Sequence, residues 1–364
     1  MIPDEVFQQT LLGFLQPIAA YLADDGVSEV MINGHEEIYV ERSGRLQLTD
    51  AHFPSEHALS SAVRNIAQYV GRSVDAERPV LDARLPDGSR VCAILPPAAR
   101  RGICVSIRRF PKERLTVDQL IRFGALTEPC RQFLDLCVQV KKNVMVAGGT
   151  GSGKTSLLNA LSSFISETER IVVIEDSSEV KLQQPHAVYL EARPPDPKGR
   201  GAVPIRELLR ATLRMRPDRI VVGECRGGEA LDLIQAMTSG HGGSLSTVHA
   251  TYPHDTLHRL ETLCLMSDVE LPLTALRAQI ASAVNLIVQT SRMNDGSRKI
   301  THVAECTGLT DAGGYALTML FEFHQSGVEA KTGRVLGALE PTGARPSFLE
   351  EIHGRGLALP AEMG

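Results

Sequence analysis

The residues best suited to chemistry lie in one glycine-rich stretch, GGTGSGKTS, at positions 148–156. It fits the pattern G-x-x-x-x-G-K-[ST], in which backbone N–H groups turn inward around phosphate oxygens. Lys154 would reach the β- and γ-phosphates as a point charge, and the Thr155 hydroxyl could coordinate Mg²⁺. A mere glycine-rich linker is disfavoured, because an apolar run precedes the loop and a helical pattern follows it. We therefore predict a phosphate-binding loop made of Gly148, Gly149, Thr150, Gly151, Ser152, Gly153, Lys154, Thr155 and Ser156.

Two later apolar runs end in acidic residues, which nucleotide chemistry would also need. The run RIVVIEDSSEV places Glu175 and Asp176 at its end and Glu179 one helical turn later. The run RPDRIVVGECRGGEA places Glu224 in the same position. In P-loop folds such strand ends face the phosphates, where one acid can hold the metal through water and another can orient the attacking water. The chain has no N-K-x-D sequence for reading guanine, so ATP is favoured over GTP.

A sheet covered on both faces must bring these residues together. Beyond about residue 125, short and nearly continuous apolar runs alternate with helical patterns, which predicts a parallel or mixed sheet buried on both faces. We expect a helix at 155–165 and a small helix in the tail. The expected strands are at 143–147, 170–176, 187–192, 219–224, 243–250 and 284–290. The sequence thus predicts one α/β domain over residues 126–364.

The first 110 residues have a different pattern, which predicts a smaller α+β domain. Apolar residues at helical spacing predict helices over 1–23 and 56–70. Two hairpins are expected, one around Asn33 and one at 86–88, followed by a strand in the run GICVSIRRF. A linker over residues 111–125, which looks as if it enters a helix, would join this domain to the next.

Composition limits the class of protein. The net charge of −5 argues against a protein dedicated to coating nucleic acid. Seven cysteines, odd in number and without a C-x-x-C pair, indicate a reduced cytoplasmic chain without a zinc cluster. The amino terminus does not resemble a secretory signal, and no apolar stretch approaches the roughly 20 residues of a membrane span. A peripheral association with a membrane protein stays open.

Four motifs in order resemble the type II/type IV secretion and pilus-assembly traffic ATPase family. They are GGTGSGKTS, the acidic box VIEDSSEV, the Walker B-like LRMRPDRIVVGECRGGEA and the histidine box GHGGSLSTVHA. The runs DARLPDGSRVCAILPP, TLHRLETL and TGARPSFLE look most like the Tad-pilus (CpaF-like) branch. Cys225 departs from the small apolar residue expected there, and the N-terminal extension is short. The tetracysteine motif of type II secretion ATPases is absent from the sequence.

The resemblance implies a RecA-like P-loop ATPase domain behind a smaller, PAS-like N-terminal domain, with ATP and Mg²⁺ as cofactors. Glu175 would polarise the attacking water, and Glu224 would contact Mg²⁺ through water, although the two acids could exchange these roles. His241 and His249 would sense the γ-phosphate. Each histidine could instead be a packed or loop residue without a catalytic role.

Arginines are a further signal, because an arginine from an adjacent subunit can stabilise charge on the transferring phosphate. Arg206, Arg210 and Arg214 recur at four-residue spacing, which places them on one face of a helix. We select Arg210 and Arg214 as catalytic candidates. The resemblance adds candidates from the N-terminal domain, which are Arg90, Arg108 and Arg109. Each arginine alone could equally be a surface residue or part of a salt bridge.

The implied function is that of a cytoplasmic, homohexameric ATPase at the inner membrane. It would act on an inner-membrane platform protein to power assembly or retraction of a Tad-type pilus, or protein secretion, with a hinge near 111–125. Three alternatives stay open: a conjugation-type translocation ATPase, a nucleotide-binding scaffold without hydrolysis, and a small-molecule kinase. The kinase is disfavoured because no lid or acceptor motif is recognisable.

Overall fold

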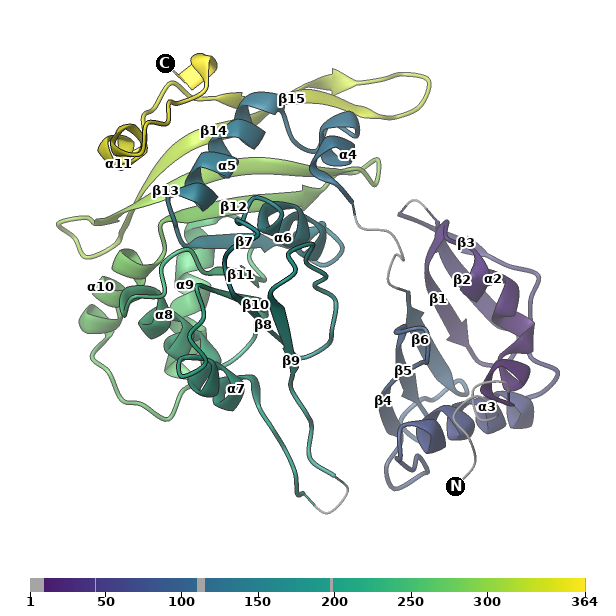
Figure 1. Cartoon of the computed structure of the whole chain (residues 1–364). Coiled ribbons are helices and arrows are strands. Elements are labelled where there is room, and N and C mark those ends of the chain that lie inside the picture. Colours follow the sequence, from purple (N-terminus) through teal and green to yellow (C-terminus); the bar gives the residue numbers. More distant parts are fainter. Residues whose placement is uncertain (1–9, 43, 110–114, 197–198, 364) are drawn as a thin grey trace. The chain divides into compact units, whose positions relative to one another are not determined.

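The computed structural model describes four stretches of the chain, 10–42, 44–109, 115–196 and 199–363. The chain divides into two compact units, residues 1–113 and 114–364 (Figure 1). Each unit has its own sheet and its own hydrophobic core. The start of the helix expected at 1–23 and part of the expected linker, residues 110–114, lie outside the described stretches.

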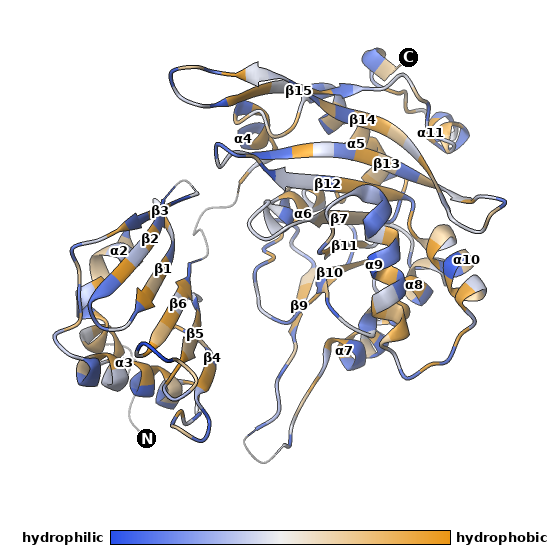
Figure 2. Ribbon diagram, turned by 180° about the vertical axis from the view of Figure 1, so that it is seen from behind, coloured by the Kyte–Doolittle hydropathy of each residue, from blue (hydrophilic) through white to orange (hydrophobic). Residues whose placement is uncertain are grey.

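The N-terminal unit is an α+β domain in which helix α3 (Glu56–Tyr69) packs with an antiparallel sheet of strand order β3-β2-β1-β6-β5-β4. Residues such as Leu59, Val63 and Ile66 repeat every three or four positions and fill one buried face of α3 (Figure 2). Both predicted hairpins and the predicted last strand are confirmed. The strands are β1 (Val27–Asn33), β2 (Glu37–Arg42), β3 (Arg45–Leu48), β4 (Val80–Arg84), β5 (Arg90–Ile94) and β6 (Cys104–Arg108).

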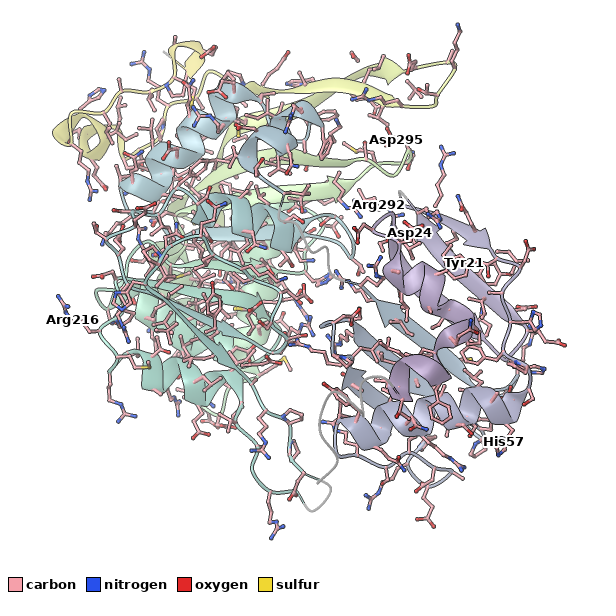
Figure 3. All side chains as sticks on the ribbon, turned by 45° about the vertical axis from the view of Figure 1, so that its right-hand side comes forward. Tyr21, Asp24, His57, Arg216, Arg292 and Asp295 are labelled. Atoms are coloured by element: carbon pink, nitrogen blue, oxygen red, sulfur yellow. The ribbon has the colours of Figure 1, made fainter. Side chains whose placement is uncertain are left out.

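The helix predicted as one piece over 1–23 is interrupted. Residues 10–14 are helical, and η1 (Gln16–Ile18) and α2 (Ala19–Ala23) follow. Pro17 lies at the break, since proline has no N–H to donate to the preceding turn. Asp24 directly follows α2 in the chain (Figure 3). Its carboxylate lies 2.6 Å from the Arg42 guanidinium and accepts a hydrogen bond from the backbone N–H of Gly26.

The C-terminal unit contains a mixed sheet of strand order β15-β14-β13-β12-β7-β11-β10-β8-β9. The pairs from β12 to β9 run parallel and those from β12 to β15 run antiparallel, so the sheet is mixed. The six predicted strands correspond to β7 to β12, and β13 to β15 were not predicted. The strands are β7 (Val144–Gly148), β8 (Ile171–Glu175), β9 (Ala187–Glu191), β10 (Arg219–Cys225), β11 (Leu245–Val248), β12 (Leu286–Arg292), β13 (Arg298–Leu309), β14 (Tyr315–Val328) and β15 (Val335–Pro341).

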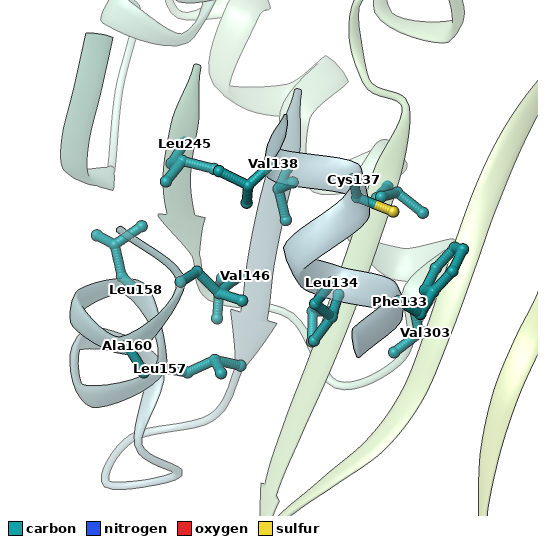
Figure 4. Packing of buried hydrophobic residues seen from close by; sticks show 14 of the residues in the cluster. Phe133, Leu134, Cys137, Val138, Val146, Leu157, Leu158, Ala160, Leu245 and Val303 are labelled. Atoms are coloured by element: carbon teal, nitrogen blue, oxygen red, sulfur yellow. The ribbon is translucent and has the colours of Figure 1, made fainter. Parts of the chain in front are cut away.

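Helices cover both faces of the parallel part of this sheet. Alternate residues of β7 enter two different cores, with Val144 and Val146 in one and Met145 and Ala147 in the other. Side chains from α5 and α6 meet β7 in the first core (Figure 4). The first core includes side chains of α5 (Glu128–Gln139), α6 (Lys154–Ser162) and the predicted tail helix α11 (Leu349–Gly354). The second includes side chains of α7 (Ile205–Thr212), α8 (Glu229–Thr238), α9 (Pro253–Leu265) and α10 (Leu273–Ala283).

The linker region contains a helix, as expected from its sequence. Helix α4 (Val117–Arg122) lies inside it and begins with a capping box between Thr116 and Gln119. Its residue Leu120 is buried in the first core of the C-terminal unit. Within the four described stretches, no helix combines the length and the apolar character that crossing a bilayer would require.

Candidate nucleotide-binding site

Four motifs meet at one edge of the C-terminal sheet because their strands are parallel neighbours. Strands β7, β8, β10 and β11 end at Gly148, Glu175, Cys225 and Val248. The carboxyl ends of parallel strands lie at the same edge of a sheet, which is where α/β folds bind ligands. Glu175 and Glu224 lie at the ends of β8 and β10, and the phosphate loop and His249 follow β7 and β11. All four features are therefore at the same edge of the sheet.

The glycines of the loop are required by its conformation. Gly151 and Gly153 have φ values of 68° and 98°, in the left-handed region that glycine adopts without strain, and α6 begins at Lys154. Gly148 is needed for a different reason. A methyl group placed on it would lie 2.3 Å from both the Ser152 and the Thr290 hydroxyl oxygens. The Thr290 side chain, on β12, thus supports the loop from behind.

Lys154 is buried and turns back onto its own loop. Its ammonium donates hydrogen bonds to the carbonyl oxygens of Gly148 and Gly149, both at 3.1 Å, and lies 3.2 Å from His249 Nε2. A phosphate entering the cradle offers stronger, charged acceptors than these neutral carbonyls. The lysine is therefore held at the mouth of the loop in a position where an anion can capture it.

His249 lies between Lys154 and Glu224. Its Nε2 atom is 3.3 Å from Glu224 Oε1, in addition to its contact with the lysine. Partial burial and then the Lys154 charge lower the pKa of His249 below its ordinary value. An ammonium can only donate, so this contact assigns Nε2 as the acceptor and the ring proton to Nδ1. The pairing with Lys154 or with Glu224 thus depends on whether Nε2 carries a proton.

Glu224 presents a buried carboxylate oxygen to this group. Its Oε1 lies 4.0 Å from the Lys154 ammonium and accepts no hydrogen bond from the described residues. Its Oε2 accepts from the Arg226 guanidinium, which also binds Asp176 at 2.7 Å. A buried oxygen without a hydrogen-bond partner is costly unless a ligand uses it. Glu224 Oε1 is therefore suited to face a cation or an ordered water.

Glu175 is the other acid of the edge, and it is nearly fully buried. Its Oε1 accepts hydrogen bonds from the backbone N–H groups of Glu179 and Val180 at 2.9 and 2.8 Å. Burial raises the pKa of Glu175 to about 7, in spite of these two hydrogen bonds. A methyl group on Gly223 would lie 2.8 Å from Glu175 Cγ, so glycine is what admits this side chain. A carboxylate with this pKa is suited to exchange protons near neutral pH.

The oxygen donors fit Mg²⁺ held together with phosphates. Thr155 is hydrogen bonded to Glu179 at 3.2 Å, and Glu224 Oε1 is the buried oxygen without a hydrogen bond described above. No group of three or more histidine, cysteine, aspartate or glutamate side chains among the described residues could enclose a metal. Mg²⁺ usually takes one or two protein oxygens and completes its shell with phosphates and water, and these residues meet that requirement.

The structure does not bring His241 to this site of its own chain, and a role of His241 in sensing the γ-phosphate stays a prediction. His241 precedes β11, whereas His249 follows it, so the strand separates them by on the order of 13 Å. The neighbouring Ser244 contacts Asn143, just ahead of β7, at the opposite edge of the sheet. In the sequence both histidines belong to one glycine-rich motif. Only the structure shows that a strand, β11, separates them.

Next to His241, Gly243 contacts a buried arginine. Arg219, at 1% exposure, donates to the carbonyl oxygens of Gly243 and Val138 and pairs with Glu169 at 2.8 Å. A methyl group on Gly243 would lie 1.9 Å from the Arg219 guanidinium. We expect Gly243→Ala to lower the free energy of unfolding by about 3 kcal/mol or more, because it displaces a buried charge from its partners. Urea denaturation measures this.

Gly240→Ala is the matched control for that prediction. Gly240 also has a positive φ, 99°, but a methyl group there meets no atom within 4 Å. It should cost only the backbone strain, about 1–2 kcal/mol. Equal losses in the two variants would contradict the role given to the Arg219 contact.

The arginines predicted to act on phosphate are engaged elsewhere within their own chain. Arg206 and Arg210 both pair with Asp232 of α8, at 2.8 and 2.7 Å. Arg214 lies beyond the end of α7, so the helical face predicted for the three residues ends before it. An action of Arg210 or Arg214 on a neighbouring subunit's nucleotide stays a prediction.

In the N-terminal unit, Arg90 pairs with Asp82 at 2.9 Å, and Arg108 ends β6 as an exposed residue. Arg109 is buried and donates to the backbone carbonyl oxygens of Asp24 and Val27. Its guanidinium therefore holds its own domain together, and contact of Arg90, Arg108 or Arg109 with nucleotide stays a prediction.

Two arginines beside the loop were missed in the sequence. Arg298 Nε donates to the Gly151 carbonyl at 2.8 Å, and a methyl group on Gly151 would lie 3.6 Å from the Arg292 guanidinium. Both belong to the β12–β13 hairpin, which begins more than a hundred residues after the loop. No motif spacing links them to it. Cys225, which departs from the family pattern, is buried in the second core.

Comparisons with known proteins agree with this geometry. Residues 14–315 match the family described as Type II/IV secretion system protein. A Mycobacterium tuberculosis protein named for conjugal transfer is 35% identical over 298 residues, which cover 80% of this chain and 83% of that protein. The type IV secretion system protein PtlH of Bordetella pertussis is 37% identical over 318 residues, covering 78% of this chain and 91% of PtlH.

Among solved structures, the ATPase DotB of Legionella pneumophila aligns with a TM-score of 0.56 at 21% identity, covering 79% of each chain. At this identity the likeness concerns the fold. It agrees with the predicted fold class, a RecA-like α/β domain preceded by a smaller N-terminal α+β domain, which is confirmed.

Proposed function

Because the chain belongs to the Type II/IV secretion system protein family, we propose that it is a hexameric ATPase motor of a pilus or secretion system. The observation that carries the proposal is the grouping of Lys154, Glu224 and His249 at one sheet edge, where β8 also ends in Glu175. A nucleotide-binding scaffold would need the loop but not a buried acid with a pKa of about 7. This grouping favours hydrolysis over binding alone.

Each residue has a role that follows from its contacts. Lys154 leaves the carbonyl oxygens of Gly148 and Gly149 for the phosphates. Glu175, in its ionised form, accepts a proton from the attacking water. Mg²⁺, when bound, neutralises charge on the phosphates, and Thr155 and Glu224 are the residues that would hold it.

The hydrogen bonding of His249 depends on whether Lys154 contacts phosphate. When phosphates bind the lysine, Nε2 of His249 loses its hydrogen-bond donor and becomes available to the nucleotide or, once protonated, to Glu224. After the terminal phosphate leaves, the lysine contact can form again. His249 thus couples the phosphate loop to the end of β11, which is the first step from hydrolysis to movement.

In a ring of six subunits, a neighbouring subunit can supply the arginine that stabilises charge on the transferring phosphate. Heterologous contacts that close produce cyclic oligomers, in which an arginine of one subunit can complete its neighbour's site. Arg90, Arg108, Arg210 and Arg214 are the candidates for this role. We place the ring at the cytoplasmic face of the inner membrane, in contact with a platform protein.

Two kinds of secretion machinery fit the family. Three runs outside the motifs favour a Tad-type pilus, namely DARLPDGSRVCAILPP, TLHRLETL and TGARPSFLE. The relatives named for conjugal transfer and type IV secretion, at 35% and 37% identity, favour a conjugation-type translocation ATPase. The second reading fits about as well as the first.

Capture of the tagged protein from native membranes, together with ATPase assays on DNA, separates the two. For a Tad-type motor we expect an integral platform protein to copurify and phosphate release to be unchanged by single- or double-stranded DNA. Stimulation by DNA, absent in a Lys154→Ala control, would instead support conjugation-type translocation. If no membrane protein copurifies and DNA has no effect on phosphate release, both proposals are contradicted.

A further inference from the structure

The β12–β13 hairpin packs against the phosphate loop through Thr290. The Thr290 hydroxyl donates to the Ala147 carbonyl at 3.1 Å and lies 2.8 Å from the Ser152 hydroxyl. Ser152 in turn donates to Gly149 at 2.9 Å. Because Ala147, Ser152 and Thr290 are buried, the end of β12 is fixed relative to the loop.

The two arginines that flank the turn of this hairpin lie beside the middle of the loop. Arg298 Nε donates to the Gly151 carbonyl at 2.8 Å, and its Cδ lies 3.3 Å from a methyl group placed on Gly153. The Arg292 guanidinium is 3.6 Å from the equivalent methyl position of Gly151. Both side chains are exposed, so a ligand in the loop can reach them.

The turn between the arginines is itself held in place. The Asp295 carboxylate accepts hydrogen bonds from Ser297 at 2.9 and 2.7 Å and from the backbone N–H of Val335 at 2.7 Å (Figure 3). Met293 and Ser297 close the turn through a backbone hydrogen bond of 2.8 Å. The hairpin is therefore anchored at its base by Thr290 and at its tip by β15, which keeps both arginines near the loop.

We propose that this hairpin forms a second wall of the nucleotide site, in which Arg292 binds the phosphate chain and Arg298 is a positioning residue. Guanidinium groups bind phosphate oxygens in a two-pronged geometry, and Arg292 is placed beside the loop that cradles them. Arg298 keeps the Gly151 carbonyl turned outward, so that the neighbouring N–H groups point to the phosphates. The inference rests on the proposed nucleotide site and adds residues to it.

Competition binding with the full-length protein tests Arg292. A fluorescent ATP analogue is displaced by ATP or by inorganic tripolyphosphate, which has phosphates but no base. We expect Arg292→Ala to weaken both competitors about tenfold or more, which is typical of one lost charged hydrogen bond, with Arg292→Lys in between. Arg345→Ala, at an exposed arginine of the tail, is the matched control and should bind as the parent does.

The competitors also separate the possible failures. Weakened ATP with unchanged tripolyphosphate would place Arg292 at the base and overturn the phosphate assignment. Unchanged binding of both would remove Arg292 from the site while leaving the proposed function intact. Failure of the parent protein to bind any nucleotide would overturn both the inference and the proposed function.

The test of Arg298 must separate a positioning role from a role in stability alone. We expect Arg298→Ala to raise the KM for ATP and the dissociation constant of tripolyphosphate by the same factor, with an unchanged unfolding midpoint. Arg298→Lys keeps a donor near the Gly151 carbonyl and should recover most of the affinity. A lowered midpoint with parent-like affinity, or no recovery by lysine, would contradict the positioning role.

Discussion

Replacing Glu175 by glutamine is expected to lower the kcat of ATP hydrolysis by about 100-fold or more, the usual contribution of a positioned general base. Glutamine keeps the shape and can still accept the hydrogen bonds from Glu179 and Val180, but it cannot take a proton from water. Nucleotide binding should survive, because Glu175 does not contact the phosphate loop in any described hydrogen bond. Phosphate release and competition binding measure the two effects separately.

The same substitution should change how stability depends on pH. The pKa of Glu175 is about 7 in the folded protein and 4.5 as a reference, so the folded state holds the proton more tightly. The stabilising contribution is therefore complete below about pH 4.5 and is lost as the pH rises through 7. Relative to the parent protein, the glutamine variant should gain about 2–3 kcal/mol of unfolding free energy between pH 5 and pH 8.5.

A matched control makes this result specific. Glu350 is an exposed glutamate at the start of α11, and Glu350→Gln should leave both kcat and the pH dependence of stability as they are. In the parent protein, kcat/KM should rise with pH through about 7, since this parameter reports the free enzyme's base. A variant at Glu175 that hydrolyses ATP at the parent rate would exclude this acid as the base.

Replacing Lys154 by alanine should have the largest effect on nucleotide binding. The loop would lose the ammonium that neutralises the β- and γ-phosphates, and charged hydrogen bonds of this kind contribute about 1.5–3 kcal/mol each. With two phosphates affected, we expect the affinity for ATP to fall about 100-fold and hydrolysis to disappear. Titration calorimetry with ATP and Mg²⁺ measures the affinity.

The control for this variant is Lys331→Ala, at an exposed lysine in the turn between β14 and β15. It removes the same charge from the chain and should bind ATP as the parent does. Thermal unfolding of both variants without nucleotide checks that they are folded. Parent-like affinity in the folded Lys154 variant would mean that the glycine-rich loop is not the phosphate site.

Much of the site could be predicted because its residues lie at the ends of buried parallel strands. Val, Ile and Leu runs mark such strands clearly, and the acid or histidine at each end is then placed by the direction of the strand. Glu175, Glu224 and His249 follow this rule. The antiparallel strands β13 to β15 were missed because only part of each is buried, so polar residues interrupt their apolar pattern.

The placements that the sequence did not reveal have physical causes of the same kind. His241 was grouped with His249 by motif, yet a strand places them at opposite edges of the sheet. Asp232, far along the chain, pairs with both Arg206 and Arg210 in their own subunit, a contact that their four-residue spacing does not reveal. Arg292 and Arg298 reach the loop only through the pairing of β12 with β7, a long-range contact that local spacing does not encode.

Phosphate release from ATP by the purified full-length chain, with Mg²⁺ and with the metal removed by chelation, tests the central claim most directly. The account predicts saturable, Mg²⁺-dependent release that Lys154→Ala abolishes and that Glu175→Gln lowers by about 100-fold or more. Release by the parent protein no faster than by Lys154→Ala, in a preparation that binds ATP, would show a nucleotide-binding scaffold and contradict the motor.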